Sequence, residues 1–151
     1  MAIDRIDWHY DSAAEQYCRE TGKTKPEGGD EITICRRAGN HIGLFIMWLV
    51  KNDLLETEEG DPEAAEMVRN EELLGVDYLM DCIDGKLWDS DIKEFAAEAV
   101  EEIYNEYLDV YSAWIDGAEY SEVSSWADYR SLAALLDESF GGRIAKLKEK
   151  A

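Results

Sequence analysis

The sequence predicts an all-α fold, with about six helices around one buried central helix and one short strand or hairpin near residues 31–35. Two observations lead to this prediction. One internal stretch is apolar on every side, and most other segments place apolar residues three or four positions apart. With 151 residues, 46% of them hydrophobic, the chain is long enough to bury a core without disulfides. No repeat or linker interrupts it, so residues 1–151 are predicted to form a single helical domain.

The central helix is predicted within residues 40–55, which read NHIGLFIMWLVKNDLL. From Ile42 to Val50 every residue except Gly43 is apolar. A helix without a polar face has to be buried all round, and this run is far shorter than the roughly 20 residues of a membrane span. Asn40 is the expected N-cap residue, and the polar residues after Val50 mark the return to solvent.

Two segments precede the central helix. Ser12 and Glu15 match a capping box, which predicts a helix from Ala13 to Gly22, because glycine favours the position after a helix end. Residues 23–39 contain one proline and three glycines and are therefore expected to be mostly loop. Within them, the stretch 31–35 alternates polar and apolar residues, which is typical of a strand.

Two helices are predicted directly after the central one. Asp61, Pro62 and Glu63 provide a cap, a proline at the first helical position and an acidic first turn, so a helix should begin there and end near Gly75. A short helix follows and stops at Asp84-Gly85. Its apolar face consists of Val76, Leu79, Met80 and Ile83.

The C-terminal half contains two more predicted helices. Ser90 or Asp91 is expected to cap the longest one, which should run to about Ile115. Its apolar side consists of Ile92, Phe95, Ala96, Ala99, Ile103, Tyr107, Val110 and Trp114. A capping box of Ser125 and Asp128 opens the last helix. Its inward face consists of Trp126, Tyr129, Leu132, Ala133 and Leu136.

The chain is strongly acidic. It contains 35 acidic and 15 basic side chains, for a net charge of −20, well beyond the magnitude of about 2–8 that keeps a small domain soluble. Residues 61–140 alone carry 22 of the acidic side chains and only 4 basic ones. Such a field repels nucleic acid and anionic membranes and favours basic protein partners.

One acidic row stands out on the predicted long helix. Glu94, Glu98, Glu102 and Glu106 repeat at intervals of four, a spacing at which like charges destabilise a helix by roughly 0.2–0.5 kcal/mol per pair. A basic partner that neutralises the row accounts for this cost. General acidity of the protein accounts for it equally well.

Residues that could support catalysis or metal binding are few. His9 and His41 are the only histidines; if they meet, they could form a metal or acid–base site with Asp7 or Asp11. Their spacing matches no metal-binding motif, so both are predicted to be structural, and no catalytic residue, metal ligand or cofactor is assigned.

The expected compartment is the cytoplasm. Cys18, Cys35 and Cys82 are odd in number and widely spaced, which indicates free thiols in a reducing environment. The first eleven residues, MAIDRIDWHYD, carry charges where a signal peptide would have an apolar run.

Several stretches carry a resemblance to a known family. They are residues 6–12 (IDWHYDS), 41–45 with Trp48, 82–87 with Trp88, 126–129 (WADY) and 135–137 (LLD). On these stretches the chain resembles a family of small acidic bacterial proteins of unassigned biochemistry, and residues 28–35 depart from that pattern. The resemblance implies an immunity protein of a bacterial competition system, which blocks one cognate toxin inside the producing cell.

The predicted function is therefore that of a non-enzymatic immunity protein. It would bind a cognate basic toxin, such as a nuclease, and occlude its active site, as a monomer or weak dimer. The expected contact face consists of Glu94, Glu98, Glu101 and Asp109; an equally acidic alternative consists of Glu63, Glu66, Glu71 and Glu72. Two other hypotheses stay open: an acidic mimic of nucleic acid that inhibits a DNA- or RNA-binding protein, and a small enzyme or metal protein that uses His9 and His41.

Overall fold

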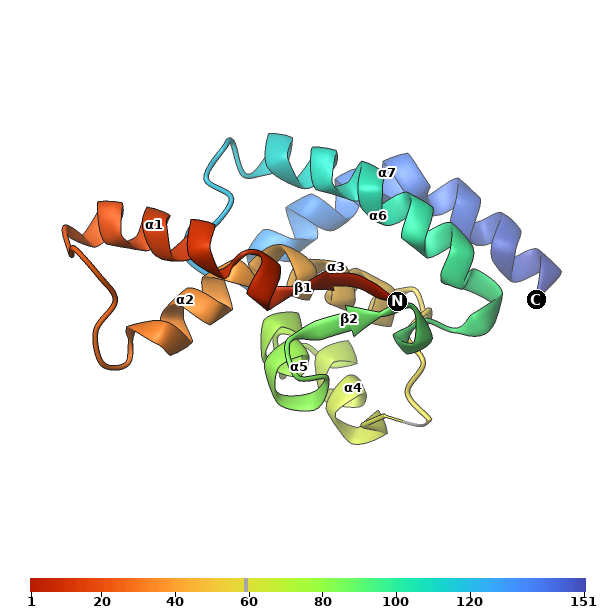
Figure 1. Cartoon of the computed structure of the whole chain (residues 1–151). Coiled ribbons are helices and arrows are strands. Elements are labelled where there is room, and N and C mark those ends of the chain that lie inside the picture. The colour runs from red at the N-terminus through yellow and green to blue at the C-terminus, as the bar shows by residue number, and fades with distance from the viewer. Residues whose placement is uncertain (59) are drawn as a thin grey trace.

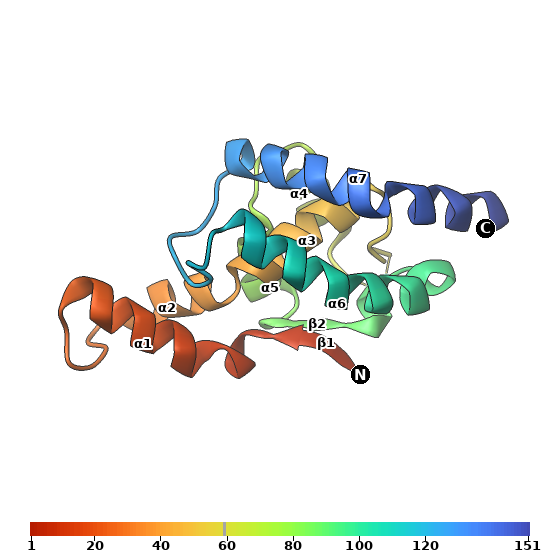
Figure 2. The ribbon, with the colours of Figure 1, turned by 90° about the horizontal axis from the view of Figure 1, so that it is seen from above.

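The computed structural model describes residues 1–58 and 60–151. Over these residues it contains seven α-helices and one two-stranded antiparallel sheet, which confirms the predicted mainly helical fold. Helix α3 (Asn40–Lys51) lies in the middle, with α6 (Ala97–Trp114) and α7 (Trp126–Lys150) on one side and α4 (Pro62–Arg69) and α5 (Gly75–Cys82) on the other (Figure 1). The view from above shows α1 (Tyr10–Thr21) and α2 (Asp30–Ala38) projecting at one end (Figure 2).

Helix α3 is the buried centre that its apolar sequence predicts. Every residue from Asn40 to Val50 is buried, and exposure returns at Lys51. Asn40 is the first helical residue rather than the cap, a position that Gly39 takes. Its side chain is used elsewhere: the amide nitrogen donates to Ser124 Oγ at 3.1 Å, and its oxygen accepts from the Ser124 backbone N–H at 3.0 Å.

Helix α3 crosses α5 at very close range because glycines line the contact. A Cβ on Gly75 would lie 1.9 Å from the Gly43 carbonyl oxygen, and a Cβ on Gly43 would lie 2.4 Å from the Val76 nitrogen. Helix α4 packs beside this pair. It begins as predicted, with Asp61 Oδ1 accepting from the Ala64 backbone N–H at 2.9 Å and Pro62 in the first turn, but it ends at Arg69 rather than near Gly75.

The other side of α3 is covered by aromatic side chains of α6 and α7. Tyr104 and Tyr107 of α6 pack against Phe45, with ring centroids 4.9 and 4.8 Å apart. Trp48 donates from Nε1 to Asp137 Oδ1 at 3.0 Å. The predicted capping box of Ser125 and Asp128 opens α7. The start of the long helix differs from the prediction, since residues 89–91 and 94–96 form 3-10 turns before α6.

The predicted strand at residues 31–35 is wrong, because these residues lie inside helix α2. Ile34 and Ala38, four positions apart, are the buried residues of this helix, whereas Ile32 is 64% exposed. The apolar alternation was therefore coincidental, and packing against α1 decides the conformation. The charges agree with a helix: Asp30 and Glu31 lie in the first turn and Arg36 and Arg37 in the last.

The sheet lies elsewhere and joins distant parts of the chain. Strand β1 (Ala2–Arg5) pairs with β2 (Lys86–Trp88), with Asp4 opposite Leu87 and a register shift between Ala2 and Asp4. A 3-10 turn, Ile6–Trp8, connects β1 to α1. This sheet places the start of the chain against α3 and α6 (Figures 1 and 2).

Within residues 1–58 and 60–151, no helix combines the length and the apolar character that crossing a membrane requires.

Candidate functional site

Two histidines and one aspartate from different elements meet between β1, α1 and α3. His9 Nε2 lies 2.6 Å from Asp4 Oδ1, and His41 Nε2 lies 3.0 Å from Asp4 Oδ2. The two imidazole rings meet edge to face at an interplanar angle of 79°, with centroids 4.4 Å apart. We call these three residues the His–Asp cluster. The hypothesis that His9 and His41 meet is confirmed.

Local structure explains how the cluster forms. Asp4 is the one buried residue of β1, because pairing with β2 turns its side chain toward the protein interior. His9 follows the 3-10 turn and directly precedes α1. His41 lies in the first turn of α3, where Tyr107 of α6 donates a hydrogen bond to its backbone oxygen. The cluster therefore depends on three elements that are far apart in sequence.

The Asp4 carboxylate is buried and accepts four hydrogen bonds. The donors are His9 Nε2, His41 Nε2, the Tyr104 hydroxyl and the Arg5 backbone N–H, the last at 2.8 Å. Burial alone would raise the pKa of Asp4, but the bonds from His41, His9 and Tyr104 outweigh burial and hold the pKa below its ordinary value. Asp4 is therefore an anion inside the protein.

The hydrogen bonds also define the state of the two imidazoles. A carboxylate can only accept, so both Nε2 atoms carry a proton. His41 is 4% exposed, and burial lowers its pKa despite the bond to Asp4, so it is neutral. The Nδ1 atom of His9 lies 2.7 Å from the Tyr120 hydroxyl, which donates to it when Nε2 carries the ring proton.

A pocket of about 210 Å³ opens beside the two rings. Its lining consists of His9, His41, Leu108, Tyr111, Ser112, Glu119 and Tyr120. Ser112 Oγ donates to Glu119 Oε1 at 3.0 Å, and Tyr111 donates to the Glu119 backbone oxygen at 3.1 Å. Imidazoles, hydroxyls and a carboxylate thus lie around a space that has room for several water molecules.

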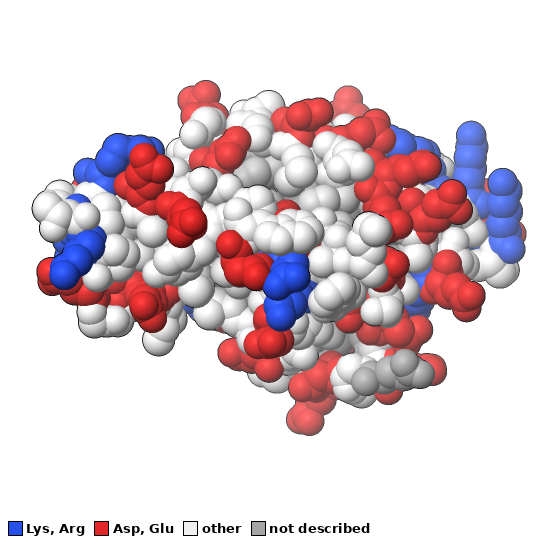
Figure 3. Space-filling model, in the orientation of Figure 1, with Lys and Arg blue, Asp and Glu red and all other residues white. Residues whose placement is uncertain are grey.

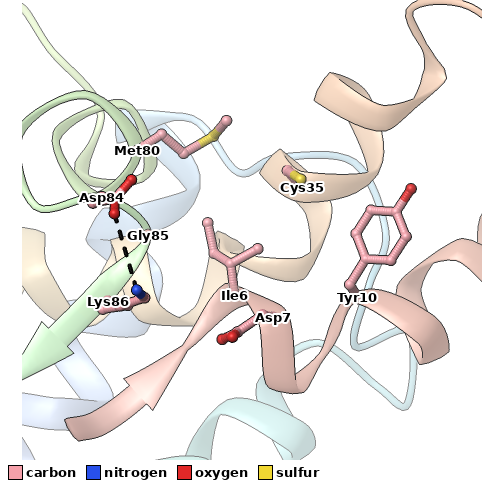
Figure 4. Close-up of a pocket in the computed structure, with 8 residues that line it drawn as sticks. All are labelled: Ile6, Asp7, Tyr10, Cys35, Met80, Asp84, Gly85 and Lys86. Carbon is pink, nitrogen blue, oxygen red and sulfur yellow. Dashed lines mark ion pairs between the residues drawn. The ribbon is translucent and has the colours of Figure 1, made fainter.

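A second pocket, of about 410 Å³, lies between α1, α2 and the turn before β2 (Figure 4). Ile6, Tyr10, Cys35 and Met80 form its apolar part, and Asp84 pairs with Lys86 at 4.0 Å on its rim.

Burial raises the pKa of the Cys35 thiol, and burial together with the Asp61 charge raises the pKa of the Cys82 thiol. Both thiols are therefore protonated at neutral pH.

The carboxylates of the expected contact face lie along α6 and the 3-10 turn before it, and we call Glu94, Glu98, Glu101 and Asp109 the α6 row. This set differs from the row at intervals of four noted in the sequence, of which Glu106 pairs with Arg143 at 2.7 Å. Glu94, Glu98 and Asp109 are exposed and Glu101 is half-buried. Glu98, Glu101 and Asp109 share the side of α6 that faces away from the buried Val100, Ile103 and Tyr107. Within residues 1–58 and 60–151, none of the four forms an ion pair.

The alternative acidic set is less available. Glu71 is engaged by both Lys51 and Arg130, and Glu66 lies 3.4 Å from the Arg69 guanidinium. Figure 3 shows carboxylates spread over most of one face of the molecule, with Lys and Arg gathered mainly toward its two ends. Of the two acidic sets, the α6 row therefore has fewer ion pairs with basic side chains among the described residues.

The sequence identified part of the His–Asp cluster. Asp7 and Asp11, the expected partners of the histidines, lie elsewhere: Asp7 binds Arg5, with Oδ2 at 2.7 Å from its guanidinium, and Asp11 is exposed in the first turn of α1. The true partner, Asp4, was missed. Asp4 lies in the short stretch Ala2–Arg5, and this stretch cannot be recognised as a strand from the sequence without its partner β2.

The chain was compared with known proteins. Neither the comparison with curated proteins nor that with solved structures found a match. A family described as a domain of unknown function (DUF7832) matches residues 2–125. The match includes the whole His–Asp cluster and its pocket as well as the acidic row on α6, and it ends where α7 begins. The chain therefore belongs to the DUF7832 family.

Proposed function

We propose that this protein binds one basic protein partner through the acidic row on α6, and that it acts as an immunity protein that occludes the active site of a cognate toxin. The observation that supports this proposal is the unpaired state of Glu94, Glu98, Glu101 and Asp109. An acidic surface held together by internal ion pairs would have to break them to bind a partner, whereas this row is free to pair with lysines and arginines.

The electrostatics favour rapid encounter with such a partner. Complementary charge raises association rates to about 10⁸–10⁹ M⁻¹s⁻¹, from about 10⁵–10⁶ M⁻¹s⁻¹ without steering. The row spans residues 98–109 of one helix, about 16 Å at 1.5 Å per residue, a length that fits a groove on a partner. Phe95, 40% exposed beside Glu94, supplies an aromatic side chain next to the row, a residue type enriched in protein interfaces.

The test begins with capture of partners from a lysate of the source organism, with washes of rising salt. An immunity protein should retain one basic protein whose activity it inhibits. A nucleic-acid mimic should instead retain several unrelated nucleic-acid-binding proteins, all displaced by added DNA or RNA. Retention of the second kind would contradict the immunity proposal and support mimicry.

A pair of matched variants then tests the surface. The α6 variant carries Glu98→Lys, Glu101→Lys and Asp109→Lys; the α4 control carries Glu63→Lys, Glu66→Lys and Glu72→Lys and therefore has the same net charge. The α6 variant should associate with the captured partner at least about tenfold more slowly, with circular dichroism unchanged. Equal rates for the two variants would show that only the total charge matters and that α6 is not the contact face.

A further inference from the structure

The Asp4 carboxylate is buried among hydrogen-bond donors. Among the described residues, its side chain contacts two imidazoles, one hydroxyl and one backbone N–H, but neither Lys nor Arg. A buried carboxylate is stabilised further by a positive charge beside it. The protein otherwise has an excess of acidic groups, so no long-range positive field substitutes for a counter-ion.

The donor atoms of the cluster match those of a metal site. Asp4, His9 and His41 each offer one ligand atom, and these atoms lie within 4.8 Å of one another. Two imidazole nitrogens and one carboxylate oxygen form a common ligand set for zinc and for other divalent transition metals. Two of the three residues are buried, so a bound ion would be held inside the protein rather than at the acidic surface.

The surroundings of the cluster also suit a metal. Metal-bound imidazoles usually engage their second nitrogen in a hydrogen bond that fixes the ring. For His9 this nitrogen is Nδ1, which lies 2.7 Å from the Tyr120 hydroxyl. When a metal takes Nε2, the ring proton moves to Nδ1 and His9 donates to the Tyr120 oxygen, so the same contact serves both states. The adjacent pocket of about 210 Å³ has room for a water molecule as a further ligand.

We propose that the His–Asp cluster binds one divalent transition-metal ion, with zinc as the preferred ion, through Nε2 of His9 and of His41 and the carboxylate of Asp4. The ion places a positive charge beside Asp4 and ties β1 and the start of α1 to α3. A neutral imidazole binds the ion after its proton moves from Nε2 to Nδ1, and an imidazolium binds it after releasing the Nε2 proton to solvent. The proposal does not depend on partner binding by the α6 row.

The direct test is titration of the chelator-treated protein with Co²⁺ and with Zn²⁺, in excess Mg²⁺ that occupies the surface carboxylates. We expect saturation at one ion per chain, visible absorption bands for bound Co²⁺ that Zn²⁺ abolishes, and a higher Tm with Zn²⁺ than with Mg²⁺ alone. Absence of saturable binding, or a Tm that Zn²⁺ leaves unchanged, would overturn the proposal.

Variants locate the ion. His9→Gln, which keeps an N–H donor for Asp4 at a half-buried position, should remove the saturable Co²⁺ bands. Tyr120→Phe should weaken binding about 10- to 100-fold, as is typical when the hydrogen bond to a metal-bound histidine is lost. The matched control is Cys82→Ser, because the Cys82 sulfur lies 3.8 Å from Asp61 Oδ2 and is another place where a metal could bind.

The pattern across these variants decides the result. Binding lost in His9→Gln, weakened in Tyr120→Phe and unchanged in Cys82→Ser supports the cluster. Binding that survives in both His9→Gln and Tyr120→Phe, or that disappears in Cys82→Ser, places the ion elsewhere and overturns the assignment. Since Tyr120→Phe removes only one hydroxyl outside the core, it keeps the test valid should His9→Gln fold poorly.

Discussion

Asp30 fixes the connection between α1 and α2. Its carboxylate accepts from Lys23 Nζ at 2.8 Å, from the Glu27 backbone N–H at 2.9 Å and from the Tyr17 hydroxyl at 2.8 Å. These bonds, with that from Lys23 the strongest, lower the pKa of Asp30 to about 2. One side chain thus holds the loop of residues 22–29 to both helices.

The lowered pKa of Asp30 predicts a specific pH dependence. The carboxylate stabilises the fold fully above the pKa of the unfolded chain, about 3.9, and this contribution is lost as the pH falls through about 2. Asp30→Asn should therefore be less stable than the wild type in urea at pH 7 and should match it near pH 2. Asp81→Asn, at an exposed position of α5, is the control and should equal the wild type at both pH values. A deficit of Asp30→Asn that persists in acid would contradict this account.

At the residue scale, the sequence predicted local features better than distant ones. Asp61, Ser125 and Gly22 act as helix ends as expected, because a cap depends mainly on its own neighbours. The capping box predicted at Ser12 is wrong, since α1 begins at Tyr10 and Ser12 lies inside it. Asp4 was missed because its burial depends on β2, far along the chain. Asn40 was assigned as a cap, yet its side chain binds Ser124 instead; nothing local reveals that choice.

Among the elements, the contact of α3 with α5 requires two glycines. A Cβ on Gly75 would lie 1.9 Å from the Gly43 carbonyl oxygen and 2.9 Å from Met47 Cγ. The nearest obstacle is backbone, which cannot rotate away, so the helices would have to separate. Gly75→Ala should therefore destabilise the protein by about 1–3 kcal/mol or more in urea unfolding.

Gly142→Ala is the matched control for this helix contact. Gly142 lies in α7, and a Cβ there would meet nothing within 4 Å. Alanine at such a position should stabilise the protein by about 0.5–1 kcal/mol, since glycine costs more conformational entropy in a helix. If Gly75→Ala proved as stable as Gly142→Ala, the close approach of α3 and α5 would not matter for the fold.

The sequence predicted elements with strong periodicity and failed where the pattern was short. Helix α3 was predicted from its long run of apolar residues. The five residues 31–35 alternate like a strand, but Ile34 and Ala38 bury one helical face against α1. Strands β1 and β2 are four and three residues long, too short for an alternation to be visible, and each pairs with a strand more than 80 residues away in the sequence.

For the whole molecule, the distribution of charge follows from the sequence, whereas the availability of each carboxylate does not. The count of acidic residues places the excess in residues 61–140. Only the structure shows that Glu71 is paired with Lys51 and Arg130 and that the α6 row is not paired within the described residues. The fold thus distinguishes two acidic sets that the sequence left equivalent.

The net charge of −20 also makes a prediction for stability. Like charges oppose compaction of the folded chain, and exposed ion pairs add only about 0–1 kcal/mol each. Salt shortens the screening length from about 10 Å at 0.1 M to about 3 Å at 1 M, so it should weaken the repulsion more than the attraction. The Tm measured by circular dichroism should therefore rise with NaCl, whose use avoids the added hydrophobic stabilisation that sulfate brings.

The variants with reversed charge test whether repulsion is the cause. Both the α6 variant and the α4 control have a lower negative charge than the wild type, so both should gain less from NaCl. The α6 variant should also be the more stable of the two in low salt, because it replaces unpaired carboxylates, whereas Glu66→Lys in the α4 control removes the contact of Glu66 with Arg69. A Tm that falls with NaCl would show instead that attraction between paired charges, such as Arg143 with Glu106 at 2.7 Å, outweighs the repulsion across the acidic surface.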